Sequence, residues 1–64
     1  MIIEIGSKFE IVFSGNIRCE VEIEDIIDQV VYYTVGYDNG KLHNRQSTKD
    51  EFAQFLTLNK ATIV

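Results

Sequence analysis

The sequence predicts a mainly β domain, a small, partly open barrel of five strands with one short helix before the last strand. Residues 17–24 alternate apolar and polar side chains without a break, and residues 30–37 are almost entirely strand formers. Residues 48–56 have the apolar spacing of a helix that packs on one side. Because five short strands must close or be covered to bury one sheet face, a barrel with the helix at its mouth is the economical arrangement.

The length of the chain supports one domain, residues 1–64. A domain of this size buries only roughly 60% of the surface that its unfolded chain exposes. The single cysteine cannot form a disulfide within the chain, so cross-links do not compensate for the thin core. We therefore expect marginal stability and no room for a deep substrate cleft.

The first two strands are predicted at Phe9–Phe13 and Ile17–Glu24. The turn signal Gly6-Ser7 precedes the first, and the hairpin-type break Ser14–Asn16 separates the two. Side chains alternate faces along a strand, so the second strand should turn its apolar residues to the core and its charged residues to solvent.

The next two strands are predicted at Val30–Tyr37 and Lys41–Gln46. A polar connection, Asp25–Gln29, should precede the third strand, which is apolar at both parities and so predicted to be covered on both sides or to twist across a corner. Asn39-Gly40 is a strong hairpin signal. The weakly apolar fourth strand is expected at an edge of the sheet.

A helix is predicted to begin at Ser47 and Thr48, since Thr48 and Glu51 have capping-box spacing. Asn59 is a suitable C-terminal cap. Three apolar residues share one face of this helix and should close the core: Phe52, Phe55 and Leu56. Residues 61–64 form the predicted last strand.

The segment Ile5–Phe9 resembles the entry of Src-homology-3-like (SH3-like) small barrels, and residues 21–35 before the Asn39-Gly40 turn are similar to their central meander. Residues 47–56 resemble the end of small barrel proteins from phages and other mobile elements. The resemblance covers most of the chain and implies a fold, which hosts unrelated functions.

Charge is unevenly distributed over the chain, whose net charge is −4. Residues 1–37 hold seven acids and two bases, whereas residues 38–64 hold three acids and four bases. Nucleic-acid affinity comes largely from Lys and Arg that neutralise phosphates, so direct binding to DNA or RNA is disfavoured. Neither a signal peptide nor a membrane span is recognisable, and we expect a cytoplasmic protein.

The main candidate site is a row of carboxylates. Glu20, Glu22 and Glu24 lie on one side of one predicted strand, and Asp25 and Asp28 follow in the next connection. Such a row attracts a basic protein surface and speeds its encounter. Its alternative interpretation is a solvated strand face that discourages aggregation. A Ca²⁺ or Mg²⁺ site is disfavoured because the loop pattern of acidic ligands and glycine is missing, and no metal or cofactor is predicted.

An alternative binding site uses the tyrosines and the basic half of the chain: Tyr32, Tyr37, Lys41, Arg45 and Lys49. Small barrels use aromatic residues to bind proline-rich peptides or to stack bases. Tyrosines on both faces of a central strand are more often core residues.

Catalysis has the weakest support in the sequence. Cys19 and His43 could in principle form a nucleophile and base. Cys19 shares the apolar parity of its strand and is expected to be an inert core residue, and His43 lies in a polar edge segment and is expected on the surface. We therefore predict a non-enzymatic interaction module that captures a basic protein surface with the acidic row. The resemblance stated above implies a modulator or inhibitor of phage or mobile-element type. The other interpretations are a nucleic-acid-associated accessory protein and a homodimer formed through an edge strand.

Overall fold

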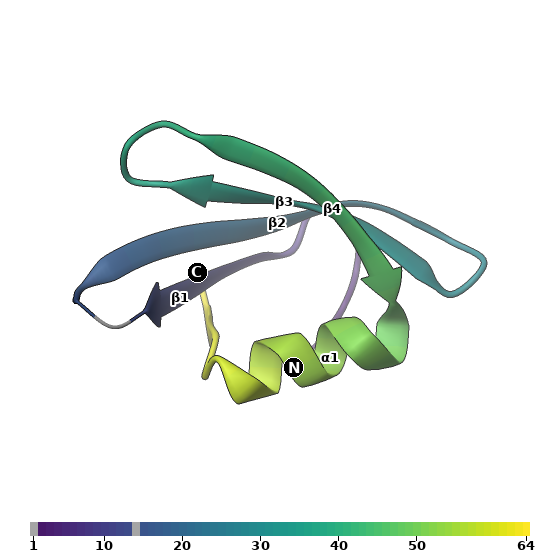
Figure 1. The fold of residues 1–64 in the computed structure, drawn as a ribbon. Helices are drawn as coiled ribbons and strands as arrows, with labels where there is room; N and C mark the ends of the chain where they lie inside the picture. Colours follow the sequence, from purple (N-terminus) through teal and green to yellow (C-terminus); the bar gives the residue numbers. More distant parts are fainter. Residues whose placement is uncertain (1, 14) are drawn as a thin grey trace.

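The computed structural model describes residues 2–13 and 15–64 and confirms the predicted class, a mainly β fold with one short helix before the last strand (Figure 1). The five strands form one open antiparallel sheet in the order β4-β3-β2-β1-β5. Their bounds are β1 Lys8–Phe13, β2 Ile17–Ile27, β3 Val30–Tyr37, β4 Leu42–Thr48 and β5 Thr62–Ile63, and the helix α1 spans Lys49–Leu58.

Tight turns join the first four strands. Gly15 and Asn16 both have positive φ, whereas Ser14, the first residue of the predicted break, lies outside the described residues. After β3, the amide of Gly40 donates to the carbonyl of Tyr37, and the amide of Lys41 donates to the side chain of Asn39, which confirms the predicted Asn-Gly turn.

The predicted polar connection Asp25–Gln29 is wrong, because β2 continues to Ile27 and only Asp28 and Gln29 form the turn. Both turn residues have positive φ (49° and 68°), as a two-residue hairpin turn of type I′ requires. The register between β2 and β3 shifts between Ile23 and Asp25, so a bulge interrupts the alternation on which the prediction relied. The tip of this hairpin extends beyond the end of the helix (Figure 1).

The helix begins where it was predicted to begin. The Thr48 side chain accepts from the amide of Glu51, and the Glu51 carboxylate accepts from the amide of Thr48, so the capping box is complete. Asn59 is the C-terminal cap. From β4 at one edge, α1 runs beneath the sheet to β5 at the other edge (Figure 1).

The core lies between α1 and one face of the sheet. Phe52 and Leu56 are fully buried, and Phe55 packs against the same cluster, as predicted from their spacing. Tyr33 packs against Phe52 with ring centroids 4.7 Å apart and ring planes tilted by 51°. The buried residues are Phe9, Ile11, Cys19, Val21, Ile23, Val31, Tyr33, Val35, Phe52, Leu56 and Ala61.

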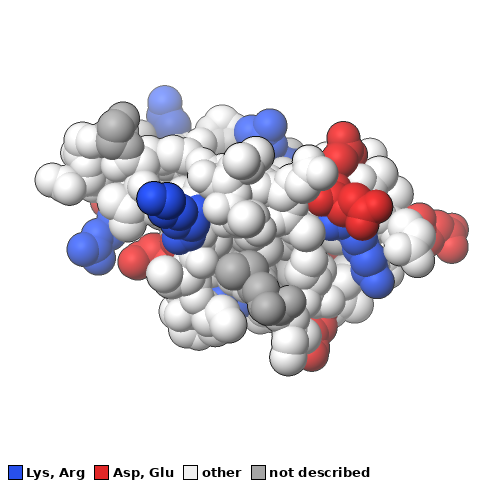
Figure 2. Space-filling view, turned by 90° about the horizontal axis from the view of Figure 1, so that it is seen from below, with Lys and Arg blue, Asp and Glu red and all other residues white. Residues whose placement is uncertain are grey.

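Among the residues that the structure describes, no helix lies over the other face of the sheet (Figure 1). Of the two alternatives predicted for β3, coverage on both sides is therefore wrong, since Val31, Tyr33 and Val35 are buried while Tyr32 and Thr34, which point the other way, are only half-buried. Figure 2 views the molecule from the helix side, where charged side chains lie mainly toward the edge of a broad uncharged surface. Within residues 2–13 and 15–64, no helix is long and apolar enough to cross a membrane.

Candidate functional site

The uncovered face of the sheet is here named the outer face. The polar side chains that alternate with the buried ones along β1 and β2 lie on it. Lys8 lies opposite Glu22, Glu10 opposite Glu20, and Val12 opposite Arg18. Across the bulge, Asp25 joins the same face opposite Tyr32. Glu24, at the bulge, lies on this face too, since its carboxylate accepts a hydrogen bond from Thr34. The acids of the outer face are Glu10, Glu20, Glu22, Glu24 and Asp25.

Glu10 and Glu20 form a cross-strand pair of like charge. The amide of Ile23 donates to the carbonyl of Ser7 (3.0 Å), one residue before β1, so the backbone groups of Ile23 are directed toward the β1 side of β2. Pair types alternate along an antiparallel ladder, so Glu10 and Glu20 occupy a non-hydrogen-bonded pair, where side chains lie closest. Like charges directly opposite each other destabilise a sheet.

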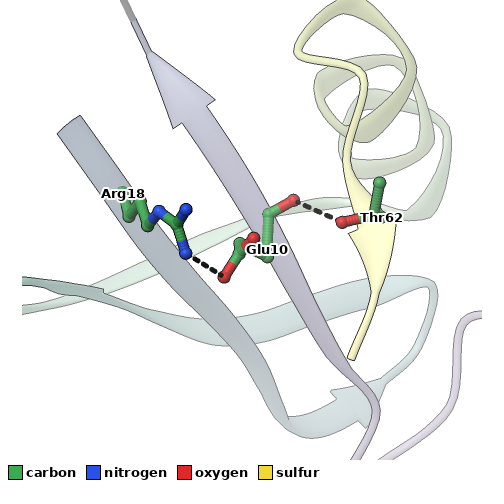
Figure 3. A network of polar contacts seen from close by, with 3 residues as sticks. All are labelled: Glu10, Arg18 and Thr62. Carbon is green, nitrogen blue, oxygen red and sulfur yellow. Dashed lines mark hydrogen bonds and ion pairs between the residues drawn. The ribbon is translucent and has the colours of Figure 1, made fainter. Parts of the chain in front are cut away.

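Two contacts hold Glu10 in place (Figure 3). Its carboxylate lies 3.9 Å from the guanidinium of Arg18 on β2, and its backbone carbonyl accepts from the hydroxyl of Thr62 on β5 at 3.5 Å. An exposed ion pair of this kind contributes about 0–1 kcal/mol. Arg18 therefore offsets part of the charge of Glu10.

Glu20 has different cross-strand neighbours from those of Glu10. Its neighbour on β1 is the like-charged Glu10, and its neighbour on β3 is Gly36, which has no side chain. A methyl group placed on Gly36 would contact the side chain of Leu42 at 3.5 Å and the carbonyl of Glu20 at 3.8 Å, which are ordinary contacts. Gly36 therefore adds no side chain to the outer face at the position that pairs with Glu20.

A surface hollow occupies this end of the sheet, here named the Gly36 hollow. Three carboxylates and one guanidinium line it, so its side chains carry an excess of negative charge. Its lining residues are Glu10, Arg18, Cys19, Glu20, Gly36, Tyr37 and Asp38. A hollow of this composition suits one cationic side chain of a partner.

The predicted acidic residues are only partly brought together. Glu20, Glu22 and Glu24 follow one another along β2, and the Glu24 carboxylate accepts a hydrogen bond from Thr34 (3.3 Å). Asp25 belongs to the strand rather than to the turn where it was predicted. Asp28 lies in the hairpin turn, eight residues from Glu20 and therefore roughly 25 Å away along the strand.

The alternative site residues do not form one surface. Tyr32 lies on the outer face, whereas Tyr37 belongs to the opposite parity of β3, packs against the core and contacts His43 edge-to-face at 5.5 Å. Arg45 pairs with Tyr33 and so belongs to the helix-side parity. Lys41 precedes β4, and Lys49 is the first residue of α1.

Cys19 is a core residue, as predicted. Its side chain is 2% exposed, and burial, followed by the negative charge of Asp38, raises the pKa of its thiol. Cys19 lies on β2 and His43 on β4, with β3 between them. The geometry therefore separates Cys19, as a candidate nucleophile, from His43, as its candidate base.

Two residues of the Gly36 hollow, Glu10 and Asp38, were missed by sequence reasoning. Glu10 belongs to the acidic row only through the register of β1 with β2, and Asp38 only through the position of the β3–β4 turn. In the described part of the chain, no group of three or more His, Cys, Asp or Glu residues is arranged to hold a metal ion. No family model, curated protein or solved structure matches the chain.

Proposed function

We propose that the protein is a small, non-enzymatic protein-interaction module that captures a basic partner surface on its outer face, centred on the Gly36 hollow. The observation that carries this proposal is the direct opposition of Glu10 and Glu20 on a face that no helix covers. An arrangement that is unfavourable in the isolated domain becomes favourable when a cation lies between the two carboxylates.

A partner Arg or Lys is the complementary group for this hollow. Its charge would lie between Glu10 and Glu20, with Asp38 also lining the hollow, while Arg18 keeps its contact with Glu10. Two opposite charges 4 Å apart attract by about 1 kcal/mol in water and about 4 kcal/mol near a protein surface. Glu22, Glu24 and Asp25 would act at longer range, steering the partner and increasing the rate of encounter.

The same proposal includes the biological setting expected from the barrel resemblance. The module would act in the cytoplasm as a modulator or inhibitor of phage or mobile-element type. Its effect would come from occupying a basic surface of the target, and the target would need no cofactor from this chain.

A pull-down from a cell lysate at low and high salt tests the proposal, with Glu20→Gln compared with Asp28→Asn. Both variants remove one negative charge, but Asp28 lies at the far hairpin turn, and Asn also tolerates its positive φ. We expect a basic protein that is retained by the wild type and by Asp28→Asn, is lost with Glu20→Gln, and is released by salt. Identical sets of retained proteins for the two variants would contradict a site at Glu20.

A further inference from the structure

β4 is an edge strand, and every second residue along it directs its backbone N–H and C=O groups away from the sheet. The amide of Tyr37 donates to the carbonyl of Lys41, and the amide of Lys49 donates to the carbonyl of Gln29, so residues 41 and 49 direct their backbone groups toward the β2–β3 side. Backbone direction alternates along an antiparallel strand. Leu42, Asn44 and Gln46 therefore direct their N–H and C=O groups away from the sheet.

One end of this edge is already closed. The amide of Thr48 has the same outward direction, and it donates to the Glu51 carboxylate within the capping box at 3.1 Å. An added strand can therefore pair with Leu42–Gln46 but not beyond it.

Most features that commonly protect an edge strand are missing from β4 as the structure describes it. The sequence contains no proline, the β3–β4 register runs from Val30 to Gly36 without a shift, and every residue of β4 except Ser47 is exposed. Natural sheets protect such edges with prolines, bulges or charged side chains, and of these β4 has only the charge of Arg45 on its helix-side face. Since neither a proline nor a bulge blocks the backbone groups, the edge is competent for strand addition by a segment that complements this charge.

The charge of this edge selects the kind of strand that can join it. Residues 41–49 contain Lys41, His43, Arg45 and Lys49 and no Asp or Glu. A second copy of β4 would bring these bases near one another, whereas acids opposite Arg45 and His43 would form favourable cross-strand pairs. Arg45 lies between the outward-directed residues Asn44 and Gln46. In pairing with an added strand it would therefore occupy a non-hydrogen-bonded position, where cross-strand side chains are closest.

We propose that β4 is a strand-addition site for an extended acidic segment of a partner protein. Backbone hydrogen bonds to Leu42, Asn44 and Gln46 would provide affinity, and Asp or Glu side chains at alternate positions would provide specificity through Arg45 and His43. This site is separate from the Gly36 hollow and does not depend on it.

Nuclear magnetic resonance titration tests this proposal, with a capped seven-residue peptide of alternating Thr and Glu as the probe. A peptide with Lys in place of Glu, a single-stranded oligonucleotide and protein dilution are the comparison arms. We expect the acidic peptide to shift the amide signals of Leu42, Asn44 and Gln46 and to slow their hydrogen exchange. The proposal would be overturned if the Lys peptide bound as well as the acidic peptide, or if the oligonucleotide bound more tightly at these amides. It would also be overturned if the same amide signals shifted with protein concentration alone, because the edge would then pair with a second copy of the domain.

Two variants separate backbone pairing from charge. Asn44→Pro removes an outward N–H while leaving the β3–β4 ladder intact, and it should abolish peptide binding in a domain whose circular dichroism remains that of the wild type. Arg45→Glu should weaken acidic-peptide binding by about fivefold, while the matched charge change Lys60→Glu should leave it unchanged. Unchanged peptide binding by the folded Asn44→Pro variant or by Arg45→Glu would refute the site. Glu20→Gln should have no effect on the binding of this peptide, because Glu20 lies in the separate Gly36 hollow.

Discussion

Replacement of Glu20 should make the domain more stable, because the wild type places two carboxylates opposite each other at Glu10 and Glu20. Like charges in this arrangement destabilise a sheet by roughly 0.2–1 kcal/mol, and Arg18 offsets part of this through its contact with Glu10. We expect Glu20→Gln to raise the free energy of unfolding by about 0.5 kcal/mol and Glu20→Lys by about 1 kcal/mol. The larger change corresponds to an increase in Tm of about 4–8 °C for a domain of this size.

Urea unfolding followed by circular dichroism measures this effect. The Debye length is about 3 Å in 1 M salt, so the difference between Glu20→Gln and the wild type should nearly vanish there. Asp28→Asn is the control for the general effect of net charge and should change stability by less than about 0.3 kcal/mol. A loss of stability in Glu20→Gln, or an equal gain in Asp28→Asn, would refute the assigned opposition of the two carboxylates.

Three further predictions concern the core, the helix cap and the buried thiol. Phe52→Ala should lower the free energy of unfolding by about 3–5 kcal/mol, because Phe52 is fully buried against Tyr33 and Phe9; a thermal shift of only a degree or two would mean that α1 is not docked as described. Thr48→Ala should cost about 1 kcal/mol in the same urea assay through loss of the capping box, and an unchanged midpoint would contradict that role. The raised pKa of Cys19 means that the folded state keeps a proton which the unfolded chain releases near the ordinary value of 9.0, so this contribution to stability is complete below that pH and is lost as the pH rises above it. Unfolding measured from neutral to alkaline pH should show a smaller alkaline loss in Cys19→Ala, and identical pH profiles would contradict the burial of the thiol.

Local patterns in the sequence were sufficient to predict most elements. The alternation from Ile17 to Ile23 predicted a strand, and the spacing of Phe52, Phe55 and Leu56 predicted the buried face of the helix. Each of these signals depends only on the chemistry of nearby residues and on one structural period. The capping box at Thr48 is equally local, and it identified the start of the helix.

The bulge and the pairing register could not be predicted in the same way. The bulge between Ile23 and Asp25 breaks the period of two, so the end of β2 was interpreted as a polar connection. The pairing of Glu10 with Glu20 depends on how β1 aligns with β2, and side-chain alternation alone does not fix that alignment. For this reason the sequence identified the acidic row on β2, whereas the Gly36 hollow became visible only in the folded chain.

Titration of the isotope-labelled domain with a hexa-arginine peptide tests the central claim most directly. If the outer face binds cations at the Gly36 hollow, the largest shifts should occur at the amides of Glu10, Glu20, Gly36 and Asp38, and Glu20→Gln should reduce them while Asp28→Asn should not. Shifts spread equally over every acidic residue, with Asp28, Asp50 and Glu51 responding as strongly as Glu20, would show that the outer face is only a solvated surface.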